Sequence, residues 1–290
     1  MRIPDSTFQA VSSRALEKSQ ARVLAATERA STGTRVLRAS DDPVAVSRLT
    51  LQDAALEKLS SMQRSADAAR VELIGADQAL GEADTLLSRV RAIAVLGSSA
   101  GMSASDQATL AAEVDQLRQA LFGTANAEQA GTYLFGGHQT DLPPFESASY
   151  AGDSGVRRAE VAPGKFIRTG IAGDLVFSTP VDLFSELEGL ATDLRAGDAD
   201  AVASRLATLD AGHEQVIQAR AGLGVSFEEL SRADDVRIEA EIGFLDARQR
   251  AVGSDFAAGA LELVEAQNAM RAAIAVATRM LEGLQPNVSA

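Results

Sequence analysis

The fold of this chain is decided by residues 59–94, which read LSSMQRSADAARVELIGADQALGEADTLLSRVRAIA. Apolar residues recur in this stretch at alternating steps of three and four, and they are Leu59, Met62, Ala66, Ala69, Leu73, Ala76, Leu80, Ala83, Leu87, Val90 and Ala94. This heptad spacing is typical of a helix that packs against other helices along one stripe. Because no proline interrupts it, we expect one continuous helix about 54 Å long at ~1.5 Å per residue.

The composition favours a helical protein with protein partners. The chain has 290 residues, of which 46% are hydrophobic but only 4% aromatic, so alanine, leucine and valine must form the core. A net charge of −13 disfavours nucleic acid and anionic membranes as partners. There is no cysteine, no apolar run near the start that predicts a cleaved signal peptide, and no 18-residue apolar stretch that could span a membrane.

Local signals place the other helices of the first half. A looser helical pattern over residues 8–30 ends at Gly33. Asp42 followed by Pro43 is an N-cap signal, so the long helix should begin there and run to Gly97. A second helix, with apolar residues at 110, 114, 117 and 121, should fold back antiparallel on the first.

The period changes near Gly131, where glycine and proline become frequent. Candidate strands at 156–161, 165–169 and 174–177 indicate a small antiparallel β unit, which we interpret as a peripheral insertion between helices. Helical spacing then returns, is interrupted at Gly222 and Gly224, and resumes to the end of the chain.

This pattern predicts a nested topology in which the two terminal segments pair and the middle of the chain forms the far end. The predicted segments are an N-terminal assembly helix (1–40), long rod helices (41–130), a β-rich outer insertion (131–180), return helices of the rod (181–254) and a C-terminal assembly helix that pairs with the N-terminal one (255–290).

No arrangement of residues predicts catalysis. The run Gly152-Asp153-Ser154-Gly155 is similar to the segment around a serine nucleophile, but it lacks the surrounding β-barrel pattern and consists of four turn formers, so we interpret it as a turn. His138 and His213 are 75 positions apart, without the spacing of a zinc site, and are expected to be solvated or capping residues. We therefore expect no cofactor, no metal and no enzymatic activity.

Three segments together resemble the flagellin family. The first is Thr32-Gly33-Thr34-Arg35-Val36 with Ser40-Asp41-Asp42-Pro43-Val44-Ala45. The second is Ala130-Gly131-Thr132-Tyr133-Leu134-Phe135-Gly136-Gly137 with Pro143-Pro144-Phe145, which is similar to members at the junction between hook and filament. The third is Asp255-Phe256 with Ala266-Gln267-Asn268-Ala269-Met270.

This resemblance implies a mainly α fold with a small β insertion, namely an elongated helical rod with a β-rich outer domain and terminal helices that form a coiled coil. It also implies a structural role in the extracellular flagellum, in a ring of subunits that joins hook to filament. The implied partners are further copies of the chain, a neighbouring hook-associated protein, hook subunits and an export chaperone, with export by the flagellar type III system. The alternatives are a flagellin-like filament subunit and an unrelated coiled-coil interaction module.

The assembly contacts are expected on the terminal helices. In the C-terminal segment the heptad stripe contains Leu263, Met270, Ile274 and Leu281, and in the N-terminal segment the apolar stripe begins with Phe8 and Val11. These six residues are our candidates for the protein interface.

Overall fold

The computed structural model describes residues 5–36, 38, 40–99, 101–146, 149–253 and 255–283. Its contacts divide the chain into two compact units. Unit 1 consists of Met1–Glu57 and Glu241–Ala290, and unit 2 consists of Lys58–Ala240. The fold is 75% helical, with long helices and a few small antiparallel strand pairs, which confirms the predicted fold class at this level.

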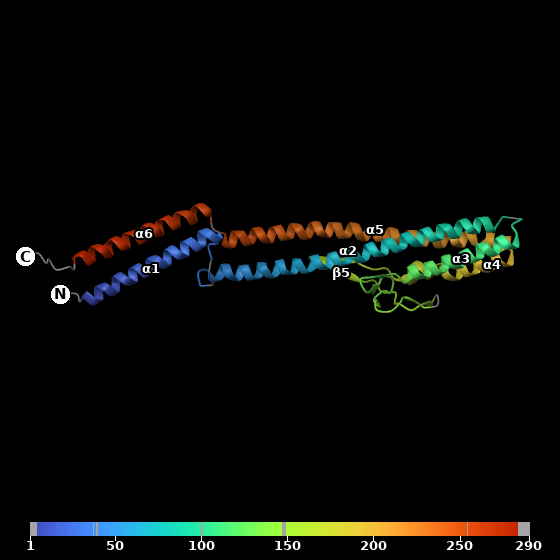
Figure 1. The fold of residues 1–290 in the computed structure, drawn as a ribbon, viewed down its shortest axis with the longest axis horizontal. Coiled ribbons are helices and arrows are strands. Elements are labelled where there is room, and N and C mark those ends of the chain that lie inside the picture. Colours follow the sequence, from blue (N-terminus) through green and yellow to red (C-terminus); the bar gives the residue numbers. More distant parts are fainter. Residues whose placement is uncertain are drawn as a thin grey trace, which may run out of the picture. The chain divides into compact units, whose positions relative to one another are not determined.

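The helices and strands follow in the order shown in Figure 1. They are α1 (Asp5–Thr32), α2 (Pro43–Gly97), α3 (Ala104–Ala125), β1 (Glu128–Gln129), β2 (Thr132–Tyr133), β3 (Phe145–Glu146), β4 (Ser149–Tyr150), β5 (Arg158–Ala162), β6 (Lys165–Arg168), the π-helical turn η1 (Asp174–Ser178), α4 (Leu183–Ala196), α5 (Ala199–Val252) and α6 (Phe256–Gly283).

The heptad stripe of α2 is the centre of unit 2. All eleven of its predicted apolar positions between Leu59 and Ala94 are buried, which confirms the prediction of one continuous packed helix. On α5, the buried residues Val202, Leu209, Val216, Leu223 and Leu230 recur every seven positions. Such matched periods let two antiparallel helices bury one stripe each along their whole length.

Ion pairs beside the stripe define the register of α2 against α5. Within unit 2 they join Arg70 to Asp234 at 2.5 Å, Asp77 to Arg220 at 2.7 Å and Arg91 to Asp210 at 2.6 Å, and a hydrogen bond joins Asp84 to His213 at 2.5 Å. The four α2 residues are spaced by seven, so they occupy one heptad position. Partly exposed pairs of this kind contribute little stability each.

The predicted interruption of the second long helix at Gly222 and Gly224 is wrong. Helix α5 continues through both glycines, and both are exposed while Leu223 between them is only 2% exposed. A glycine in a helix costs about 1 kcal/mol relative to alanine, whereas burying a leucine contributes about 2 kcal/mol. Packing of the stripe therefore outweighs the local preference of the glycines.

Helix α3 folds back along α2, as predicted, and α4 packs against it. The ion pair from Arg89 to Glu113, at 2.6 Å, joins residues on either side of the turn after Gly97. Ser103 is the N-cap of α3, since its hydroxyl accepts a hydrogen bond from the Asp106 amide. Together these helices cover one side of the α2 and α5 pair (Figure 1).

The segment between α3 and α4 contains three separate two-stranded antiparallel sheets. Strands β5 and β6 were predicted, but the third candidate strand at 174–177 is wrong, because these residues form η1. Helical geometry there turns Val176 and Phe177 together into the core, which an alternating strand could not do. The segment is also not peripheral, since Phe145 and Phe177 pack against Phe184 of α4 and Phe135 packs against Phe177.

Candidate assembly surface on the terminal helices

Within unit 1, α1 and α6 lie side by side (Figure 1). Many of the residues that are buried or half buried recur at steps of three and four on both helices. Among them are Ser12, Leu16, Ser19, Val23, Ala26 and Ala30 on α1, and Leu263, Ala266, Met270, Ala273 and Ala277 on α6. Most of these side chains are small, so the pair buries little apolar area and is weak on its own.

A polar group at this contact weakens the pair further. Ser19 is 8% exposed, and its hydroxyl has no hydrogen-bond partner among the described residues. Burying an unsatisfied hydroxyl costs about 1–3 kcal/mol. The ion pair between Arg29 of α1 and Glu262 of α6, at 2.5 Å, is partly exposed.

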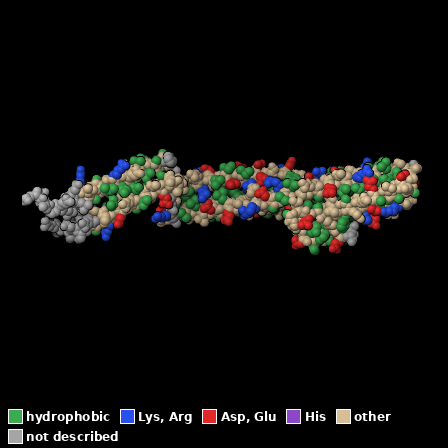
Figure 2. Space-filling view, in the orientation of Figure 1, with side chains coloured by type: hydrophobic (Ala, Val, Ile, Leu, Met, Phe, Trp, Pro, Cys, Tyr) green, Lys and Arg blue, Asp and Glu red, His purple; other side chains and the backbone are tan. Residues whose placement is uncertain are grey.

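The outer faces of the same two helices carry large apolar side chains in water (Figure 2). Their exposed fractions are 60% for Val11, 70% for Leu24, 61% for Leu261, 52% for Val264, 45% for Ile274 and 52% for Val276. Single exposed apolar residues are ordinary, but several on one narrow helix pair indicate a surface that a partner covers.

A groove runs between the two helices on this surface. It has a volume of about 320 Å³ and is lined by Val11, Ser12, Ala15, Ala272, Ala273, Val276 and Ala277. Because every lining residue except Ser12 is apolar, the groove is suited to an apolar side chain from another helix. No charged residue of the described chain lines it.

The structure brings four of the six predicted interface residues into this surface. Val11 lines the groove, Leu263 and Met270 are half buried at the contact with α1, and Ile274 lies beside that contact with 45% of its surface exposed. The side chains of Phe8 and Leu281 lie outside the described part of the structure.

Sequence reasoning missed part of the contact line of α1. The predicted stripe passed through Val11, whereas the contact line passes through Ser12 and Ser19. Serine gives no apolar signal, so the line could have been found only by extending the three and four steps backward from Val23 and Ala26.

The segment that resembles flagellins at the start of α2 has a defined structural role. Asp42 caps the helix, since its Oδ1 accepts a hydrogen bond from the Ala45 amide at 2.9 Å, as predicted. This hydrogen bond, and then the nearby Arg35 guanidinium, hold the pKa of Asp42 below its ordinary value. Arg35 also contacts the end of α5.

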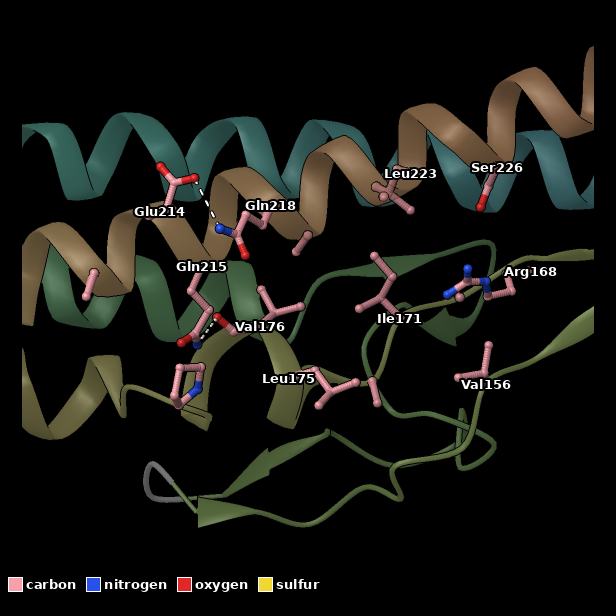
Figure 3. Close-up of a pocket in the computed structure, with 16 residues that line it drawn as sticks. Val156, Arg168, Ile171, Leu175, Val176, Glu214, Gln215, Gln218, Leu223 and Ser226 are labelled. Atoms are coloured by element: carbon pink, nitrogen blue, oxygen red, sulfur yellow. Dashed lines mark hydrogen bonds between the residues drawn. The ribbon is translucent and has the colours of Figure 1, made fainter.

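Unit 2 has a second apolar groove, of about 520 Å³, between α5 and the loops around η1 (Figure 3). Leu175 and Ile171 come from the loops, while Gln218 and Leu223 come from α5. Below it, the buried Gln215 donates from Nε2 to the Val176 carbonyl at 2.8 Å and accepts from the Val181 amide at 3.0 Å. Gln215 thereby fastens η1 and its following loop to α5, with its amide group satisfied.

The residues weighed as catalytic candidates are structural. Asp153 of the Gly152-Asp153-Ser154-Gly155 turn accepts hydrogen bonds from the His138 and Gly155 amides, both at 2.8 Å, and these lower its pKa. His138 is exposed, as expected, but His213 differs from expectation because it is partly buried beside Asp84.

The described residues contain no group of three or more His, Asp or Glu side chains that could hold a metal ion. No helix in the described ranges is long and apolar enough to cross a membrane.

Comparison with known proteins relates the chain to flagellar proteins. Residues 5–140 match the bacterial flagellin N-terminal helical region. The chain is 26% identical over 294 residues to flagellar hook-associated protein 3 of Escherichia coli K12, which covers 92% of this chain and 93% of that protein. It is also 26% identical over 183 residues to flagellar hook-associated protein 3 of Salmonella typhimurium, which covers 62% of this chain and 57% of that protein.

The fold agrees with this relationship. The crystal structure of flagellar hook-associated protein 3 from Legionella pneumophila superposes with a TM-score of 0.63 at 15% identity, over 69% of this chain and 98% of that one. Long paired helices and the match over residues 5–140 define a flagellin-like helical protein of the bacterial flagellum. Over residues 5–140 the chain is similar to the flagellin family, and both relatives above are named flagellar hook-associated protein 3.

Proposed function

We propose that this protein is a subunit of the hook–filament junction, which joins hook to filament as a ring of copies held by coiled-coil contacts between terminal helices. Similarity to two proteins named flagellar hook-associated protein 3 supports the location. The observation that carries the mechanism is the set of apolar residues that α1 and α6 leave exposed although the two helices already pack together.

The energetics of the terminal pair favour assembly. A contact of serines and alanines buries too little to hold two helices firmly, while the exposed valines, leucines and Ile274 would gain about 25 cal/mol per Å² when neighbouring copies cover them. Stable burial of these helices therefore requires other copies. The predicted division into segments 1–40, 41–130, 131–180, 181–254 and 255–290 remains our working scheme, with 1–40 and 255–290 as the assembly helices.

Partners and route follow from the proposed location. Besides further copies, the partners are the hook subunits and a neighbouring hook-associated protein, with a flagellar chaperone before export. Export uses the flagellar type III system without a cleaved signal peptide, and the assembled protein is extracellular.

The test is a charge placed on the proposed interface. Ile274→Asp should leave the secreted monomer soluble with an unchanged unfolding midpoint, since this side chain is already 45% exposed. Covered by a neighbouring helix, the unpaired carboxylate would cost several kcal/mol and prevent assembly. We therefore expect cells with hooks, filament protein lost to the medium and no swimming.

Asn268→Asp is the matched control, because it adds the same charge to the same helix at an exposed polar position. These cells should swim. Normal filaments on cells with Ile274→Asp would exclude this surface as an assembly contact. Electron microscopy of flagella from a deletion strain separates the alternatives, since loss of a filament subunit leaves intact hooks with their junction proteins and loss of an unrelated coiled-coil module leaves normal flagella.

A further inference from the structure

Two segments that connect helices contact each other in unit 1. Residues 33–42 connect α1 to α2, and residues 253–255 connect α5 to α6. Thr34 and Gly253 form an antiparallel bridge between them, and the Arg35 amide donates a hydrogen bond to the Val252 carbonyl at 2.7 Å. The two connectors, far apart in sequence, are thus hydrogen-bonded to each other.

The Arg35 side chain adds a second link between the same connectors. Its Nη2 atom donates to Oδ2 of Asp42 at 3.0 Å and to the Ala251 carbonyl at 3.3 Å. Asp42 is the N-cap of α2, and Ala251 lies in the last turn of α5. One nitrogen atom therefore contacts the beginning of one long helix and the end of the other.

Both contacts match the electrostatics of helix ends. The last carbonyls of a helix have no partner inside it and attract cations, while the first amides attract an acidic side chain. Arg35 supplies a cation to the end of α5 and at the same time holds the carboxylate that caps α2. Loss of the Arg35 side chain would remove a contact at both helix ends at once.

We propose that Arg35 is a positioning residue that couples the two connectors, so that a disturbance in one loosens the other. Its consequence for the flagellum rests on the proposed function: α1 and α6, which adjoin these connectors in the chain, would take up the positions needed for assembly together. The coupling itself is a property of the isolated protein.

Hydrogen exchange of the full chain, followed by mass spectrometry, tests the coupling. Arg35→Ala should speed exchange by about tenfold both around Ala45, where the N-cap is weakened, and around Gly253. Arg35→Lys should retain most of the protection, because a single nitrogen makes both side-chain contacts. Arg250→Ala is the matched control, since it removes a positive charge near the same connector but its partner is Asp246 on its own helix.

The reciprocal experiment begins from the other connector. Gly253→Ala places a Cβ against the Gln249 carbonyl oxygen and should disturb the end of α5. If the connectors are coupled, exchange must also rise around Arg35 and Ala45. Faster exchange confined to the substituted connector in both variants would overturn the inference, and since no flagellum is needed, that result would leave the proposed function untouched.

Discussion

Replacing Gly222 and Gly224 by alanine should stabilise the protein, because α5 is continuous at these positions. Both glycines are exposed, and a Cβ added to either would meet nothing within 4 Å. Alanine is favoured over glycine in a helix by about 0.8–1.0 kcal/mol. The double variant Gly222→Ala/Gly224→Ala should therefore raise the free energy of unfolding of unit 2 by about 2 kcal/mol.

The assay is thermal and urea unfolding followed by far-UV circular dichroism, on the single and double variants. For a unit of this size, 1 kcal/mol corresponds to about 2–4 °C in Tm, so we expect a gain of roughly 4–8 °C. The two substitutions should act additively, because neither added methyl touches another group.

The control is Gly212→Ala on the same helix. There the added Cβ would collide with Cδ2 of Leu183, so the same exchange should destabilise the protein. If the double variant at 222 and 224 were neutral or destabilised while Gly212→Ala behaved as expected, α5 would be interrupted in solution as the glycines alone suggest. That result would refute our explanation that packing of Leu223 outweighs the low helix propensity of the two glycines.

Two further predictions concern the segment between α3 and α4. Phe177→Ala should lower the free energy of unfolding by about 3–5 kcal/mol, because this fully buried ring packs on Phe135 and Phe184, and an unchanged urea midpoint would place the segment outside the core. Burial raises the pKa of Tyr150 to about 12, so in a Tyr133→Phe variant the phenol absorbance should titrate near pH 12. Its contribution to stability is complete below pH ~10 and is lost as the pH rises toward 12, and titration near 10 in the folded protein would exclude this burial.

Sequence patterns predicted the structure correctly where many positions must all be apolar and buried on one face. The stripe of α2 predicted eleven buried positions, and all eleven are buried. A continuous helix places every position of a heptad repeat on the same face, so the eleven residues are buried together. The start of α2 was also predicted correctly. An N-cap residue followed by proline favours the start of a helix through local backbone interactions, which packing does not change.

Local signals failed where distant contacts compete with them. Gly222 and Gly224 predict a break, but Leu223 is held in the stripe by α2. Residues 174–177 have β-favouring side chains, but the shared core with Phe184 and the amide of Gln215 select a helical turn. In both places the free energy comes from residues more than thirty positions away or from another helix, so a local pattern cannot contain it.

For the candidate assembly surface, too, the sequence predicted one part and only the structure showed the other. The sequence by itself determined that both terminal segments are amphipathic helices, and it supplied Val11, Leu263, Met270 and Ile274 as candidates for the interface, because helical period depends only on spacing. Only the tertiary structure decided which side chains α1 and α6 bury between them and which they leave exposed. It alone showed Arg35 joining Asp42 to Ala251, because contacts between residues 35 and 251 depend on how the chain returns and not on any local preference.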